Sequence, residues 1–274
     1  MLILVGLVLT SVSLLLSLRT GTRGALPAVG VAGLAAFVLL GPGLGLAPLM
    51  GWIAVYQLER DEAFGRVVAG ALLPAAVFCL WMVFSVSDSQ TLQSRSDEVV
   101  QQFEALGMEM EPQALEGMVY MVLRVQPAVE FVSLLLTFLL AFRLAGLLAP
   151  RFGVEEFPVP PPMQLWRPWE ELIWVMIGAL AISLLGGGWL EDLALNLVVV
   201  MAVIYAVQGL AVLRFFARRQ GVPRAMEWPF YLALLLVAGL AMLILAGVGL
   251  LDTWFDWRRL RPALPDEDED EDEI

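Results

Sequence analysis

The sequence predicts an all-α protein, a polytopic transmembrane helix bundle of about eight spans with an extramembrane helical hairpin. The first observation is composition, since 59% of the residues are hydrophobic and the mean hydropathy is +0.80. The second is charge, because 16% of the residues are charged and a soluble domain usually carries about 25%. The third is Leu193–Gln220, which offers about 20 residues before its first charge, enough for a bilayer core of roughly 30 Å.

Other apolar stretches along the chain repeat this pattern. We interpret the first stretch as a retained span and not a signal peptide, because it lacks a basic start and a cleavage site before Arg19. Pro74 predicts a kink in the fourth span. The predicted spans are Met1–Leu18, Pro27–Leu40, Leu44–Leu58, Val67–Val86, Ala128–Leu148, Glu170–Leu185, Leu193–Gln220 and Pro229–Leu250.

The second and third spans come from one uncharged stretch, Ala25–Leu58, which is too long for a single crossing. Gly41-Pro42-Gly43 interrupts it and favours two short spans. One span followed by a re-entrant segment is the alternative, which a bilayer permits where protein buries the backbone.

We expect a single transmembrane domain over residues 1–262, with the hairpin inserted at 88–126. Val99, Val100, Phe103 and Leu106 have helical spacing, Gly107 ends that helix, and Pro112 starts a second one running towards Pro127. Residues 263–274 are predicted to be a disordered acidic tail, because like charges repel. The tail supplies much of the net charge of −12, so we infer no acidic functional surface.

Two segments carry signs of the membrane interface. Pro150–Pro168 is rich in proline, which favours an extended linker, and Trp166 and Trp169 favour the bilayer surface. A PxxP partner site is the alternative there. After the last span, Trp254, Phe255 and Trp257 predict an interfacial belt.

Arginines in alternate loops indicate the orientation. By the positive-inside rule these loops are cytoplasmic, which puts the N-terminus and the hairpin outside. Eight spans also place Arg258, Arg259 and Arg261 outside, which disagrees with the rule. The loop arginines are Arg19, Arg23, Arg60, Arg66, Arg143, Arg151, Arg167, Arg214, Arg218, Arg219 and Arg224.

The residue types exclude several chemistries. The chain has no histidine, all its basic residues are arginine, and Cys79 is the single cysteine. A histidine-based triad, a lysine Schiff base and a disulfide framework are therefore excluded, and a Cys/His metal site has almost no ligands. We expect no enzyme activity, no cofactor, no metal site and no nucleic-acid partner. The expected partner is the lipid bilayer.

Polar residues inside spans are candidates for ligand contact, because burying them in lipid is costly. Asn196, Tyr205 and Gln208 are the predicted ligand-binding residues, and an interhelical hydrogen bond is the alternative for Asn196. Asn196 and Gln208 lie about 120° apart around the helix, whereas Tyr205 is one turn from Gln208.

Small residues recur every four positions at Ala28, Ala32 and Ala36. They predict a face that allows close helix contact, for internal packing or for docking a partner protein.

Three acidic residues near span ends need partners. Glu130 is expected at the outer membrane interface, where placing a carboxylate costs little free energy. Asp252 and Asp256 are expected to form interfacial ion pairs with Arg258 and Arg259, with partner docking as the alternative.

Several segments resemble the YybS-like family of predicted bacterial membrane proteins, whose function is unknown. They are VQPAVEF at Val125–Phe131, FPVPPPMQLWRPWEELIW at Phe157–Trp174, LALN and YAVQGLAVLRFF within Leu193–Phe216, and GLLDTWFDWRRL at Gly249–Leu260. Through that family the chain distantly resembles the substrate-binding S subunits of energy-coupling-factor transporters and the cell-shape protein MreD. The resemblance implies a six-helix ligand-binding core with added helices, in the bacterial cytoplasmic membrane.

Two functions follow as hypotheses. The first is a non-enzymatic, transporter-type subunit that binds a small, largely apolar molecule and relies on a membrane or ATPase partner for energy. The second is a scaffold for envelope, cell-shape or division machinery, acting through the helices and the outer hairpin. A membrane-embedded enzyme is disfavoured, because histidine, lysine and clustered acids within spans are lacking.

Overall fold

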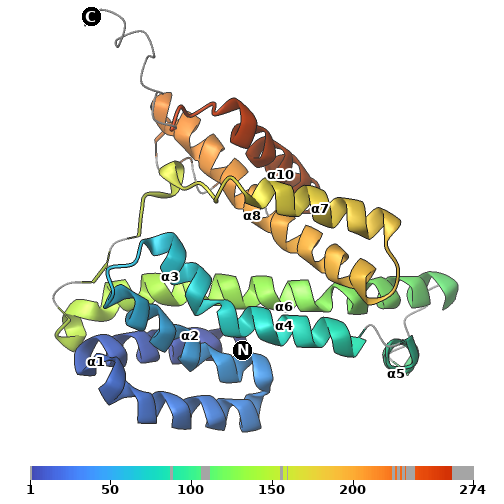
Figure 1. Cartoon of the computed structure of the whole chain (residues 1–274), viewed down its shortest axis with the longest axis horizontal. Helices are drawn as coiled ribbons and strands as arrows, with labels where there is room; N and C mark the ends of the chain where they lie inside the picture. The colour runs from blue at the N-terminus through green and yellow to red at the C-terminus, as the bar shows by residue number, and fades with distance from the viewer. Residues whose placement is uncertain are drawn as a thin grey trace, which may run out of the picture. The chain divides into compact units, whose positions relative to one another are not determined.

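The computed structural model describes residues 2–86, 89–105, 112–154, 157–158, 160–223, 226, 229, 232 and 238–260. Regular structure in these ranges is entirely helical, which confirms the predicted fold class (Figure 1). The chain divides into two compact units, unit 1 with Met1–Pro160 and Met176–Val200, and unit 2 with Pro161–Val175 and Met201–Ile274. The single domain over 1–262 stays a prediction, and the acidic tail at 263–274 lies outside the described residues.

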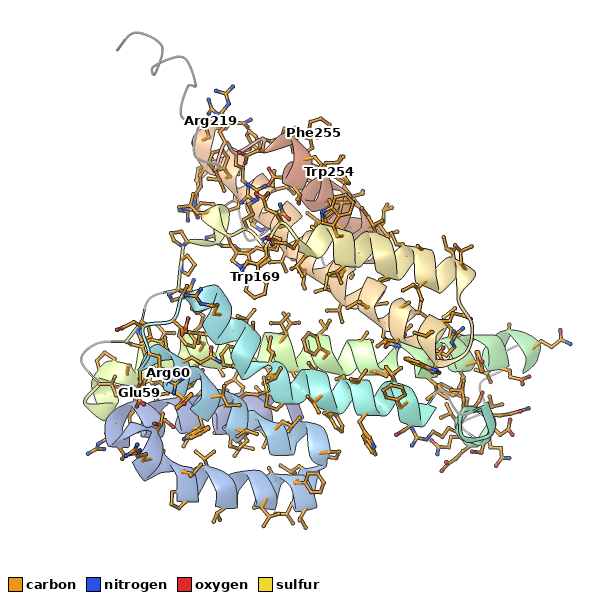
Figure 2. The ribbon with its side chains drawn as sticks, in the orientation of Figure 1. Glu59, Arg60, Trp169, Arg219, Trp254 and Phe255 are labelled. Atoms are coloured by element: carbon orange, nitrogen blue, oxygen red, sulfur yellow. The ribbon has the colours of Figure 1, made fainter. Side chains whose placement is uncertain are left out.

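The first helix, α1 (Leu2–Leu40), joins the first two predicted spans without a loop. It bends at Gly21, whose φ of 75° is readily adopted only by glycine. Glu59, labelled in Figure 2, directly follows α2 (Pro42–Leu58). Its carboxylate accepts hydrogen bonds from the backbone N–H and the hydroxyl of Thr22 at 3.2 and 2.8 Å. The carboxylate therefore caps the second half of α1 where the bend frees a backbone donor.

The predicted break at Gly41 is confirmed. Gly41 has a φ of 102°, and Pro42 begins α2, where its missing N–H costs nothing. The helix α2 packs against the first half of α1, with the Ser13 hydroxyl donating to the carbonyl oxygen of Pro48 at 2.6 Å. Ala25–Leu58 thus contains two helices; whether both cross the bilayer stays a prediction.

The next span is bent as predicted. The helices α3 (Phe64–Ala71) and α4 (Leu73–Val86) meet at an angle of 41°, with Pro74 in the first turn of α4. The first predicted hairpin helix forms as α5 (Ser89–Ala105), which packs on α6.

The second hairpin helix was predicted wrongly as a separate element. The helix α6 (Pro112–Leu148) runs unbroken for 37 residues through Pro127, so the hairpin arm and the following span are one helix. A side chain from a neighbouring helix bridges the backbone beside Pro127, as described below.

The core of unit 1 lies where α1, α2, α3, α4 and α6 meet. Small residues of α2 and α3 let the helices approach, and aromatic side chains of α6 fill the centre. The core side chains include Leu14, Met50, Ala54, Val67, Ala71, Phe138, Phe142 and Ala145.

The proline-rich segment contains two short 3₁₀ turns, η1 (Ala149–Phe152) and η2 (Met163–Leu165), and is otherwise non-helical where described. The helix α7 (Leu172–Leu185) follows, and Gly188, with a φ of 62°, allows the tight turn into α8 (Trp189–Arg219). The last described helix is α10 (Ala238–Phe255), so the first part of the predicted span Pro229–Leu250 lies largely outside the described residues.

Many large apolar side chains face outward from these helices. Val31 is 71% exposed, Leu147 78% and Leu185 86%. Exposing such apolar side chains to water costs free energy, whereas exposing them to lipid does not. In the described part of the chain, α1, α6 and α8 are long and apolar enough to cross a membrane, and the bent pair α3–α4 can supply a fourth span. The helices α7 and α10 are apolar but shorter, and the number of about eight crossings stays a prediction.

Candidate functional site

Within unit 2, two glycines bring α8 and α10 into backbone contact. A Cβ at Gly209 would clash with the carbonyl oxygen of Leu245, and one at Gly249 with the carbonyl oxygen of Tyr205. Small residues at a crossing allow such an approach between apolar helices. The contact brings Gln208 of α8 next to Asp252 and Thr253 of α10.

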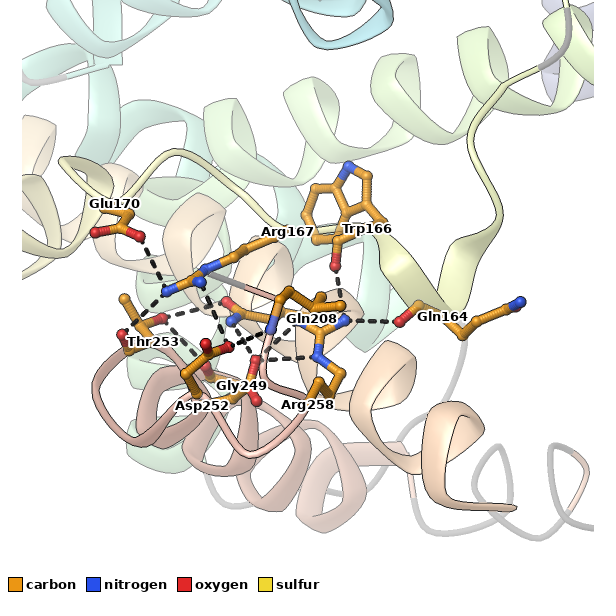
Figure 3. A network of polar contacts seen from close by, with 11 residues as sticks. Gln164, Trp166, Arg167, Glu170, Gln208, Gly249, Asp252, Thr253 and Arg258 are labelled. Carbon is orange, nitrogen blue, oxygen red and sulfur yellow. Dashed lines mark hydrogen bonds and ion pairs between the residues drawn. The ribbon is translucent and has the colours of Figure 1, made fainter. Parts of the chain in front are cut away.

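A buried ion pair lies beside this crossing (Figure 3). Asp252 is 1% exposed and Arg258 4% exposed. One carboxylate oxygen, Oδ2 of Asp252, accepts hydrogen bonds from Nη2 of Arg258 at 2.8 Å, Nε of Arg258 at 3.2 Å and Nε2 of Gln208 at 3.1 Å. Buried charges need partners of this kind, because their desolvation is expensive.

The same guanidinium holds the proline-rich segment. Nη1 of Arg258 donates to the carbonyl oxygens of Gln164 and Trp166 at 2.9 and 3.0 Å. Prolines leave backbone carbonyls in this segment without helical partners, and an arginine can satisfy several at once because it has five donors.

A second arginine, Arg167, ties the segment to the end of α10. Its Nη2 donates to the carbonyl oxygen of Thr253 at 3.2 Å, and the guanidinium pairs with Glu170 at 3.2 Å and Asp256 at 3.6 Å. Three stretches far apart in the sequence therefore meet in one polar cluster, which we call the Asp252 cluster: Gln164, Trp166, Arg167, Gln208, Asp252, Thr253, Asp256 and Arg258.

Two buried oxygens of unit 2 have no hydrogen-bond partner among the described residues. They are the hydroxyl of Tyr205, a residue that is 1% exposed, and Oδ1 of Asp252. Few buried polar atoms in folded proteins stay unpaired, because each costs about 1–3 kcal/mol. The hydroxyl can donate or accept a hydrogen bond, and the carboxylate oxygen can only accept one.

The structure separates the three predicted ligand residues. Tyr205 and Gln208 belong to unit 2, where Gln208 bonds to Asp252 and Thr253, and no described hydrogen bond joins it to Tyr205. Asn196 belongs to unit 1 and lies 5% exposed. Ligand binding by these residues stays a prediction.

Asn196 bridges the backbone of α6 beside Pro127. Its Oδ1 accepts from the N–H of Ala128 at 2.8 Å, and its Nδ2 donates to the carbonyl oxygen of Arg124 at 2.8 Å. Proline lacks an N–H and widens the adjacent turn, so the carboxamide supplies the polar contacts that the helix needs there. The interhelical hydrogen bond, the alternative from the sequence, is present.

Next to this bridge, the Arg124 guanidinium pairs with Glu191 and Asp192 in the first turn of α8. Nε of Arg124 donates to Oδ1 of Asp192 at 2.6 Å, and Nη2 donates to Oε1 of Glu191 at 2.7 Å. No local pattern predicts this pairing, because Glu191 and Asp192 lie 67 and 68 positions after Arg124.

The alanine stripe does not present one uniform face. Ala28 is exposed, Ala32 is half-buried and Ala36 is buried at 4% exposure. Its role in docking a partner stays a prediction.

The expected pairing of Asp252 with Arg258 is confirmed, and the pair is buried within unit 2; its position at the membrane interface stays a prediction. Asp256 instead pairs with Arg167, and its Oδ1 accepts from the backbone N–H of Leu260 at 3.1 Å. Sequence reasoning missed the part played by Gln164, Arg167 and the Trp166 carbonyl. A signal existed, because they lie in a segment that carries the family resemblance.

Glu130 lies beside Gly43 in the first turn of α2, where a Cβ would clash with its Oε1. A carboxylate at a helix N-terminus is stabilised by the helix dipole. Among the described residues, no group of three or more His, Cys, Asp and Glu side chains is placed to hold a metal ion.

Comparison with known proteins gives one match. A family model described as "Predicted membrane protein (DUF2232)" matches residues 1–253. It is consistent with the YybS-like resemblance, whereas the resemblance to energy-coupling-factor S subunits and MreD is not shown. No curated protein and no solved structure matches the chain.

Proposed function

Because the chain belongs to this family of predicted membrane proteins, we propose that it is a non-enzymatic subunit that binds a small molecule in unit 2 and works with a partner protein. The observation that carries the proposal is the pair of unpaired buried oxygens at Tyr205 and Asp252. A ligand with an N–H or O–H group would satisfy either oxygen, and an apolar body would suit the surrounding helices. The resemblance to predicted bacterial membrane proteins favours the bacterial cytoplasmic membrane, and the arginine pattern of the loops indicates the orientation there.

The groups that contact the Asp252 carboxylate are already engaged with described partners. Oδ2 of Asp252 accepts three hydrogen bonds, and Gln208 and Arg258 are held by described partners. These contacts fix the carboxylate, so Oδ1 is presented in one position. A fixed acceptor loses little entropy when a ligand binds, which favours affinity.

Native mass spectrometry of the purified full chain tests this proposal. We expect a co-purified small molecule whose occupancy falls about 2- to 10-fold in Tyr205→Phe, the value of one lost hydrogen bond. The control is Tyr56→Phe, because Tyr56 lies in α2 of unit 1. Tyr205→Phe removes an oxygen without described partners, so it should leave folding intact. Equal occupancy in both variants and the parent contradicts the proposal.

A scaffold role has one observation in its favour. The helix α5 is polar and packs on α6; it buries Leu92 and Ser96 and exposes Arg95, Asp97 and Glu98. Such a charged surface suits a protein partner. Photocrosslinkers at Asp97 and Glu98 should then capture a defined envelope or division protein in cells, whereas crosslinkers at Val31 on α1 should capture none. An equal yield of the same products at both positions argues against the scaffold.

A further inference from the structure

The C-terminal ends of α8 and α10 lie at the same end of unit 2. Nη1 of Arg214, near the end of α8, lies 3.7 Å from the sulfur of Met163, and Arg258, just after α10, bonds to the carbonyl oxygen of Gln164. Both arginines therefore reach the same 3₁₀ turn, η2. Arg258 and Arg259 thus lie at the same end of unit 2 as the predicted cytoplasmic arginines of α8, which favours one side for both and not the opposite sides that a single span at Pro229–Leu250 predicts.

Exposed arginines and exposed aromatic side chains occur together at this end. Arg219 ends α8, and Arg259 follows α10; both are exposed. Trp254 is 53% exposed and Phe255 is 64% exposed, at the last turn of α10 (Figure 2). We call these four residues together with Trp257 the arginine–aromatic surface.

The arginines of this end differ in how their charge is balanced. Arg258 is neutralised by Asp252, and Arg167 is shared between Glu170 and Asp256. The described ion pairs leave Arg219 and Arg259 facing outward with their charge available. A tight turn holds Arg259 there, because its backbone N–H donates to the carbonyl oxygen of Asp256 at 2.7 Å.

We propose that the arginine–aromatic surface binds the phosphate of anionic phospholipid headgroups. Guanidinium groups bind phosphate oxygens through paired charge-assisted hydrogen bonds. Exposed tryptophan side chains, such as Trp254 and Trp257 at the same end of unit 2, favour the level where headgroups meet acyl chains. The cytoplasmic leaflet is the more anionic one in the usual arrangement, which agrees with the positive-inside orientation. The surface is separate from the unpaired oxygens of Tyr205 and Asp252, so this inference does not rest on the proposed function.

Lipid binding by the full chain in neutral detergent tests the proposal. The probes are phosphatidylglycerol and phosphatidylcholine with identical acyl chains, and native mass spectrometry measures the bound fraction during titration. We expect a clear preference for phosphatidylglycerol, reduced about 30-fold in Arg219→Gln/Arg259→Gln, which removes two surface charges. Using the full chain keeps the acidic run Asp266–Glu273 the same in every sample.

The matched control is Arg95→Gln, which removes an exposed arginine from α5 in unit 1. It should keep the phosphatidylglycerol preference. Salt at 0.5 M should weaken the preference in the parent, because exposed charges are screened. Equal binding of the two lipids overturns the proposal, and so does an equal loss in Arg95→Gln and the double variant. The melting temperature shows whether the arginine double variant is misfolded. If it is, Trp254→Ala/Phe255→Ala serves as the second test, because the preference for phosphatidylglycerol must also fall in that variant.

Discussion

The carboxylate of Asp252 lies in the interior of unit 2, where polar side chains surround it. Oδ2 of Asp252 receives three hydrogen bonds, two of them from Arg258. A buried ion pair adds little net stability by itself, but removing one partner leaves an uncompensated charge. The main effect of the pair is therefore to determine that α8, α10 and the proline-rich segment meet at this point. Its contribution to the stability of the fold is smaller.

Replacing Arg258 with glutamine should be strongly destabilising. The free energy of unfolding in micelles should fall by about 3–5 kcal/mol, because Asp252 loses its counter-charge while buried. The neighbouring change Arg259→Gln should cost no more than about 0.5 kcal/mol, because Arg259 is exposed. Asp252→Asn combined with Arg258→Gln should recover much of the loss; a double variant as unstable as Arg258→Gln would show that the charge is not the cause.

The sequence predicts that Asp252 and Arg258 pair, but it does not predict that the pair is buried. Six residues separate Asp252 and Arg258, so a local ion pair could be read from spacing. The burial of this pair could not be predicted from spacing. It depends on Gln208, Gln164 and Trp166, which lie 44, 94 and 92 residues from their partners. Hydropathy gives no information on such distant contacts.

Between elements, the glycine crossing of α8 and α10 decides how closely the helices approach. Gly249→Ala should lower the free energy of unfolding by about 1–3 kcal/mol, because a methyl group there meets the Tyr205 carbonyl. Gly247→Ala on the same helix should be neutral or slightly stabilising, because its Cβ meets nothing within 4 Å. The comparison uses thermal unfolding in identical micelles, and equal effects at the two positions would exclude the crossing as the cause.

The bridge from Asn196 to α6 should depend on Pro127. Asn196→Leu should cost about 1–2 kcal/mol in the parent, since its hydrogen bonds to Arg124 and Ala128 are lost. In a Pro127→Ala background the same change should cost less, because α6 can then close its own hydrogen-bond ladder. A double-mutant cycle of unfolding free energies measures the difference. An identical cost in both backgrounds would mean that the bridge serves another purpose.

Helix positions were largely predictable, and helix boundaries were less so. The length of the uncharged apolar stretch predicts α8, and Gly41-Pro42 predicts the end of α1. Pro127 predicts a helix boundary because proline removes a backbone donor, yet α6 continues through it. The compensating side chain, Asn196, lies on another helix, so no local pattern could reveal it.

For the whole molecule, the shared end of α8 and α10 predicts that Gln220 and Leu260 lie on the same side of the membrane. Single cysteines at Gln220 and Leu260, in a Cys79→Ser background, should both react with an impermeant maleimide only when it is supplied from the cytoplasmic side. A cysteine at Gln101, in the predicted outer hairpin, should react from the opposite side. Labelling of positions 220 and 260 from opposite sides would contradict the arrangement.

The contacts of Arg258 also bear on how the protein is made. Because translation is directional, the proline-rich segment and Gln208 leave the ribosome well before the aspartate and arginine that later hold them. Until then, two backbone carbonyls and the Gln208 amide must stay hydrated or be shielded by the insertion machinery. A nascent chain stalled before residue 252 therefore displays unsatisfied polar groups, a feature by which membrane quality-control proteases could distinguish it from the finished product.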